Sequence, residues 1–76
     1  MRFEVCVVYT GGLDEELDSK LRKVAGQPAT FRGMDLGTTE RELCWMFNTW
    51  VEAVNCQVRL EAVDPRVTVH CDPPAH

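Results

Sequence analysis

The amino-terminal third of the chain changes its hydrophobic period once, and this change restricts the fold more than any other feature. From Arg2 to Thr10 the side chains alternate, and the apolar parity consists of Phe3, Val5, Val7 and Tyr9. A period of two predicts a β-strand with one buried face. After Gly11-Gly12 the apolar residues recur every three or four positions, at Leu13, Leu17, Leu21 and Val24. This spacing predicts an amphipathic helix over Leu13–Ala25.

The end of that helix and the segment after it are marked by glycine and proline. Gly26 is expected to cap the helix in the left-handed conformation, and Pro28 prevents its continuation. Ala29–Leu36 favours a short edge strand, in which Gly33 interrupts the alternation and suggests a bulge. Gly37-Thr38-Thr39 then makes a turn. The nearby charged residues, namely Arg32, Asp35 and Arg41, are interpreted as a solvated turn.

The segment from Arg41 to Val63 has two interpretations. In the first, Arg41–Phe47 is a strand with Leu43, Trp45 and Phe47 facing inward, and a helix begins at Thr49 with a Thr49-x-x-Glu52 capping box. In the second, one helix runs from Glu40 to Val63. Such a helix would be about 36 Å long, which exceeds the diameter of a compact domain of this length. We therefore favour a strand followed by a helix.

A last strand completes the pattern. Val67, Val69 and Cys71 alternate with polar residues after Asp64-Pro65, and residues 73–76 are expected to form a disordered tail. Residues 1–72 are then a single domain with the order strand, helix, strand, strand, helix, strand. This order resembles the ferredoxin-like superfold of the α+β class over Arg2–Asp72. The resemblance implies a four-stranded antiparallel sheet with two helices on one face.

Charge and composition narrow the classes of partner. The 76 residues carry a formal net charge of −4, with most of the excess in the second half. An acidic surface disfavours direct binding to nucleic acid and favours a basic protein partner. We find neither a signal peptide nor a membrane span, so a cytoplasmic location without membrane contact is expected. The four cysteines, Cys6, Cys44, Cys56 and Cys71, are interpreted as buried free thiols.

The predicted sheet leaves one face without a helix. By parity this face is expected to hold Glu4, Cys6, Val8, Glu42, Cys44, Met46, Arg66, Thr68 and His70. Half of that surface is apolar, which is common where a partner docks. We therefore predict that the partner-binding residues are Glu4, Val8, Glu42, Cys44, Met46, Thr68 and His70. The second helix is an alternative contact, because it has one apolar side with Ala53, Cys56, Leu60 and Val63 and another with Val51, Val54 and Val58.

The sequence contains few signals for chemistry. Cys6, Cys44 and His70 would suit zinc if the strand registers aligned, but without a Cys-x-x-Cys pair we interpret the cysteines as apolar filling and predict no metal and no cofactor. A Cys44/His70 nucleophile pair lacks an orienting third group, so no enzyme is expected. Gly11-Gly12 matches no phosphate-binding motif. Trp45 and Phe47 differ from the aromatics of RNA-recognition motifs because they share the parity of Leu43.

These observations lead to one functional expectation and one alternative. The chain is expected to be a non-catalytic protein-binding module that can self-associate as a dimer. In size and acidity it resembles small phage-encoded inhibitors of the anti-CRISPR type, which implies that it blocks a basic nucleic-acid-handling host complex such as a CRISPR effector. The alternative is a small-molecule or metal-sensing regulatory domain that binds its ligand at a dimer interface.

Overall fold

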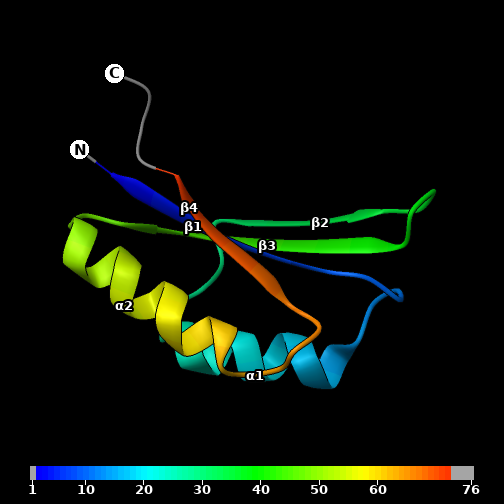
Figure 1. Ribbon diagram of the computed structural model, residues 1–76. Helices are drawn as coiled ribbons and strands as arrows, with labels where there is room; N and C mark the ends of the chain where they lie inside the picture. Colours follow the sequence, from blue (N-terminus) through cyan, green and yellow to red (C-terminus); the bar gives the residue numbers. More distant parts are fainter. Residues whose placement is uncertain (1, 73–76) are drawn as a thin grey trace.

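Six elements follow one another in the computed structural model, which describes residues 2–72. They are β1 (Phe3–Tyr9), α1 (Glu15–Ala25), β2 (Phe31–Asp35), β3 (Glu40–Phe47), α2 (Trp50–Glu61) and β4 (Thr68–Asp72). The four strands form one antiparallel sheet in the order β2-β3-β1-β4. Both helices pack against the same side of this sheet (Figure 1). The chain therefore has the ferredoxin-like α+β arrangement that its element order predicts.

The strand β3 settles the choice between the two interpretations of the middle segment. It pairs with β1 on one side and with β2 on the other, so a continuous helix from Glu40 is excluded. The helix α2 starts after Thr49, whose hydroxyl accepts a hydrogen bond from the Glu52 N–H at 3.2 Å and donates one to the Glu52 carboxylate at 2.8 Å. The predicted cap is confirmed, because this hydroxyl satisfies an N–H that has no partner within the helix.

The core lies between the odd-numbered residues of β1 and β3 and the inner sides of the helices. Val5, Leu43 and Trp45 are fully buried, as are Ala53, Cys56 and Leu60 of α2. The Trp45 indole N–H donates to the backbone carbonyl of Gln27 at 3.0 Å, which satisfies its one polar group. Phe47 is also buried. The aromatics of β3 therefore belong to the core, as their parity predicts, and not to a base-stacking surface.

The start of α1 differs from the prediction. Asp14 is the N-cap, and its carboxylate accepts a hydrogen bond from the Leu17 N–H at 3.1 Å. Leu13 therefore precedes the helix and is 50% exposed, although its spacing had placed it in the apolar stripe. An aspartate at this position stops the helix from starting earlier because its side chain takes the place of the missing helical acceptor. Gly26, at φ 75°, caps the other end as predicted.

The strand β2 is shorter than predicted and contains no bulge. Gly33 pairs with Glu42 in an unbroken register. Its lack of a side chain has a steric cause, since a Cβ atom there would lie 2.7 Å from the ring of Phe31. The glycine leaves room for that ring over the sheet, so the break in the hydrophobic alternation reflects packing and not backbone geometry.

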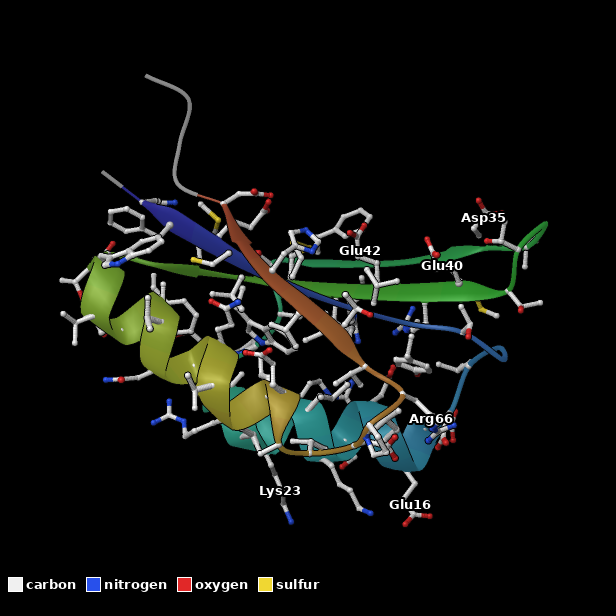
Figure 2. All side chains as sticks on the ribbon, in the orientation of Figure 1. Glu16, Lys23, Asp35, Glu40, Glu42 and Arg66 are labelled. Carbon is white, nitrogen blue, oxygen red and sulfur yellow. A yellow bond between two sulfur atoms is a disulfide. The ribbon has the colours of Figure 1, made fainter. Side chains whose placement is uncertain are left out.

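Arg66 was predicted on the open side of the sheet, and this is wrong. β4 begins only at Thr68, and Arg66 bonds to Asp64 and to Asp14 at the amino end of α1, with 3.0 Å between Arg66 Nη2 and Asp14 Oδ2. Figure 2 shows Arg66 beside α1. The attraction between the Arg66 guanidinium and the carboxylates of Asp14 and Asp64 thus places Arg66, and the alternating pattern of β4 does not extend back to it. The predicted tail at residues 73–76 lies outside the described residues.

Candidate functional site on the open sheet face

The side of the sheet that faces away from both helices is called the open face here. Its strand residues are Glu4, Cys6 and Val8 of β1, Phe31, Gly33 and Asp35 of β2, Glu40, Glu42, Cys44 and Met46 of β3, and Thr68, His70 and Asp72 of β4. All the predicted partner-binding residues are in this set. The registers therefore bring together side chains from four strands that are far apart in the sequence.

The open face is acidic. Its carboxylates are those of Glu4, Asp35, Glu40, Glu42 and Asp72, and none of its strand positions holds a lysine or an arginine. Figure 2 shows Asp35, Glu40 and Glu42 on the side of the β2–β3 hairpin that is turned away from the helices. Neighbouring strands lie about 4.8 Å apart, so the three carboxylates of the hairpin are close enough to act jointly on an approaching ion or protein.

Two arginines close to the sheet, Arg41 and Arg66, are held away from this face. Arg41 has the inward parity of β3, and Arg66 bonds to Asp14 and Asp64. Lys23 extends from α1 on the far side of the molecule (Figure 2). Arg2, directly before β1, shares the parity of Glu4. The open-face strand positions nevertheless hold five carboxylates and no base, so the net charge of −4 is concentrated on this side of the sheet.

Two cysteines at the centre of the open face form a disulfide. Cys6 and Cys44 are directly opposite each other on β1 and β3, with their Cα atoms 4.2 Å apart. This spacing corresponds to the non-hydrogen-bonded pairs of antiparallel strands, in which side chains come closest. The prediction of free thiols is therefore wrong for these two residues. A cross-strand disulfide between these cysteines is conceivable from the sequence only in an oxidising setting, and the pairing itself depends on the strand register across a separation of 38 residues.

The disulfide belongs to a row of side chains that crosses the sheet. His70 lies opposite Cys6, and Phe31 lies opposite Cys44. Potential ligand atoms of Cys6, Glu42 and His70 lie within 4.8 Å of one another, and those of Glu4, Cys6 and Cys44 do the same. The strand registers therefore do align, which the sequence could not establish. While the sulfurs are bonded to each other, they offer no thiolate to a metal or to a substrate.

The other two cysteines are free thiols, as predicted, and lie on the helix side. Cys56 is fully buried in α2, and burial raises the pKa of its thiol. Cys71 is partly buried, and its pKa is raised by burial and by the carboxylate of Asp72. A thiol with a raised pKa is a poor nucleophile near neutral pH because little thiolate is present.

A polar hollow on the helix side is a second site to consider. It is lined by Leu13, Glu15, Asp18, Arg22, Arg32 and Arg41. Two nitrogens of the Arg41 guanidinium donate to Asp18 Oδ2, Nε at 3.1 Å and Nη2 at 2.8 Å. The third, Nη1, donates to the Gly33 carbonyl at 3.2 Å. The Tyr9 hydroxyl donates to the other Asp18 oxygen. Arg41 is thus not part of a solvated turn. Arg41 has the same parity as the buried Leu43 and Trp45, and this spacing in the sequence could have indicated that its side chain points to the helix side.

The hydrogen bonds in that hollow argue for a structural role. Within residues 2–72, every buried side-chain nitrogen and oxygen has a hydrogen-bond partner. Burial and the hydrogen bond to Asp18 raise the pKa of Tyr9, so its hydroxyl stays protonated and remains a donor. A group that is already satisfied has little to gain from a ligand.

The loop between β1 and α1 also has a structural explanation. Gly11 and Gly12 have φ angles of 98° and 86°, which favour glycine. The Gly12 N–H donates to the Thr39 carbonyl at 3.0 Å and so ties the loop to the β2–β3 turn. This N–H is occupied, which agrees with the interpretation of the two glycines as a turn.

The outer side of α2 exposes apolar side chains. Trp50, Val51 and Val58 are 48%, 67% and 61% exposed. The ring of Trp50 packs against that of Phe3 with 5.4 Å between centroids. The stripe of Ala53, Cys56 and Leu60 therefore packs inward, and the second predicted stripe is largely uncovered in this chain.

No protein-family model matches this chain, and no curated protein is significantly similar to it. Neither helix of the described part of the chain has the length and hydrophobicity needed to cross a membrane.

Proposed function

We propose that this protein is a non-catalytic binding module whose open face docks onto a positively charged surface of another protein. The observation that carries the proposal is the charge separation across the sheet, with Glu4, Asp35, Glu40, Glu42 and Asp72 on the open face and no lysine or arginine among its strand residues. Like charges placed together destabilise the free domain by mutual repulsion. A cationic partner relieves this repulsion on binding.

The open face also supplies apolar contacts for affinity. Val8 and Met46 lie among the carboxylates, and Phe31 is 49% exposed at the edge strand β2. Charged groups around such anchors steer the encounter and fix its orientation, while the desolvated apolar residues supply much of the binding free energy. A face that combines carboxylates with Val8, Met46 and the edge-strand ring of Phe31 therefore suits a basic protein surface.

The partner class that fits best is a protein that handles nucleic acid. Such a protein presents arginine and lysine side chains spaced to meet phosphates, and carboxylates on neighbouring strands can engage the same groups. Occupying that surface would exclude the nucleic acid by direct competition. On this proposal the module acts as an inhibitor of the phage-encoded, anti-CRISPR type, in a cytoplasmic setting where its target works.

A binding titration with matched variants tests the proposal. The probe is a fluorescently labelled oligo-arginine peptide, and the readout is anisotropy at low and at physiological salt. The variant Glu4→Gln/Glu40→Gln/Glu42→Gln removes three charges from the open face. The control Glu15→Gln/Glu16→Gln/Glu61→Gln removes three from exposed helix positions, so the two proteins have equal net charge.

The two variants are expected to behave differently. Each exposed ion pair contributes up to about 1 kcal/mol, so the open-face variant should bind about tenfold or more weakly, and the control should bind within about twofold of the wild type. Equal weakening in both variants would mean that the peptide responds to net charge alone, and the docking role of the open face would be rejected.

A further inference from the structure

Cys6 lies at the centre of a set of metal-ligating groups on the open face. Cys44 flanks it on β3 and His70 flanks it on β4, each in direct register. The carboxylate of Glu42 lies within 4.8 Å of ligand atoms of both Cys6 and His70. Two sulfurs, one imidazole nitrogen and one carboxylate oxygen are the kinds of ligand that zinc takes, in a tetrahedral arrangement.

We propose that reduction of the Cys6–Cys44 disulfide converts this cluster into a binding site for one zinc ion, held by Cys6, Cys44, His70 and Glu42. This goes beyond docking, because it assigns the open face a ligand of its own. Metal–ligand bonds of about 2.0–2.3 Å place tetrahedral ligand atoms roughly 3.3–3.8 Å apart. The ligand atoms of Cys6, Glu42 and His70 already lie within 4.8 Å of one another, so side-chain shifts of about 1 Å bring these three into range. Cys44 lies opposite Cys6 and has to turn its sulfur toward them once the disulfide is broken.

A dithiol can serve as the reductant of the Cys6–Cys44 disulfide. The dithiol transfers two electrons and two protons to the disulfide, which yields the thiols of Cys6 and Cys44, and the dithiol is itself oxidised to a cyclic disulfide. Zinc then displaces the two thiol protons and forms two zinc–sulfur bonds. The disulfide and the zinc complex use the same two sulfurs, so they exclude each other.

The side chains around the cluster allow the conversion between the disulfide and the zinc complex. Both sulfur-bearing residues are only 3% exposed, and their outer neighbours in the row are Phe31 and His70, on the edge strands. These two side chains are about half exposed, at 49% for Phe31 and 47% for His70, and exposed side chains change rotamer quickly. Asp72 Oδ2 lies 3.7 Å from His70 Nε2, where a carboxylate can orient the imidazole.

Titration with Co²⁺ tests the site, since tetrahedral cobalt thiolates absorb visible and near-ultraviolet light. The protein is treated with dithiothreitol, desalted under argon and titrated beside an untreated, oxidised sample. We expect the sulfur-to-cobalt absorption to saturate at one ion per chain in the reduced sample, to be absent from the oxidised sample, and to disappear when zinc is added. Zinc should also raise the melting temperature of the reduced sample only.

Three variants show which residues bind the ion. Cys6→Ser and His70→Ala should each weaken cobalt binding by at least about tenfold, and circular dichroism checks that both remain folded. Cys71→Ser removes a thiol from the helix side and should bind as the wild type does. Equal absorption in the oxidised and reduced samples would overturn the proposal. So would an intact signal in His70→Ala, or a loss in Cys71→Ser as large as that in Cys6→Ser.

Discussion

Arg41 donates two hydrogen bonds to a single carboxylate oxygen of Asp18 and so joins β3 to α1 beneath the sheet. The two side chains are only 13% and 5% exposed. The pair also directs the one arginine of β3 away from the open face. The same contact therefore contributes to the packing of α1 and to the acidity of the opposite surface.

Asp18→Asn should lower the free energy of unfolding by about 2–3 kcal/mol, because it leaves the charge of Arg41 without a counter-ion in a largely buried position. Urea denaturation followed by circular dichroism measures the change. Glu16→Gln is the matched control, since it breaks the exposed Glu16–Lys20 pair and should cost less than about 0.5 kcal/mol. Similar losses in the two variants would show that burial adds nothing to the Asp18–Arg41 pair.

The phenol of Tyr9 should titrate above its ordinary pKa in the folded protein, because burial and the hydrogen bond to Asp18 favour the neutral form. Tyr9 is the only tyrosine, so phenolate absorbance reports it alone. The midpoint should return to about 10 in denaturant. Since the pKa is raised on folding, the stabilisation is complete below pH 10 and is lost as the pH rises through the folded pKa. A folded midpoint at or below 10 would contradict the hydrogen bond.

Arg66→Gln should raise the pKa values of Asp14 and Asp64. In the wild type, the Leu17 N–H and the Arg66 guanidinium lower the pKa of Asp14, and the backbone and side chain of Arg66 lower that of Asp64. Stability from these depressed values is present above the unfolded pKa and is lost as the pH falls through the folded one. Carboxyl NMR titration measures both groups. Unchanged midpoints of Asp14 and Asp64 in the variant would contradict the contacts of Arg66 with both carboxylates.

Reduction of the Cys6–Cys44 disulfide should lower the free energy of unfolding by about 2–4 kcal/mol in metal-free buffer. The bond closes a loop with a sequence separation of 38, and releasing it restores entropy to the unfolded chain. Urea denaturation with and without reductant measures the loss. The double variant Cys6→Ala/Cys44→Ala should be insensitive to reductant. If it responded as the wild type does, the effect would have to come from another pair of cysteines.

The sequence was sufficient to predict the fold because its local signals agree with one another. The alternation in β1 and β3, the stripe of α1, and the caps at Gly26 and Thr49 each reappear in the structure. The errors arose where a single side chain outweighed the local pattern. Asp14 delays the start of α1, and Phe31 needs the space at Gly33.

The site was less predictable, because its chemistry depends on register. Parity correctly placed Glu4, Glu42 and His70 on one face, but parity cannot show that Cys6 lies opposite both Cys44 and His70. The disulfide and the ligand cluster follow from that register alone. The acidity of the open face was also underestimated, because Arg66 was assigned to it and Asp35, Glu40 and Asp72 were not.

NMR mapping of the surface that meets a cationic partner tests the proposed role of the open face most sharply. Oligo-arginine peptide is added to isotope-labelled oxidised protein, and amide and side-chain shifts are followed. The perturbed signals should cluster on Glu4, Glu42, Met46, Thr68 and His70 and should fade as salt is raised. Perturbations centred instead on α1, or on Trp50, Val51 and Val58 of α2, would show that the open face is not the binding surface.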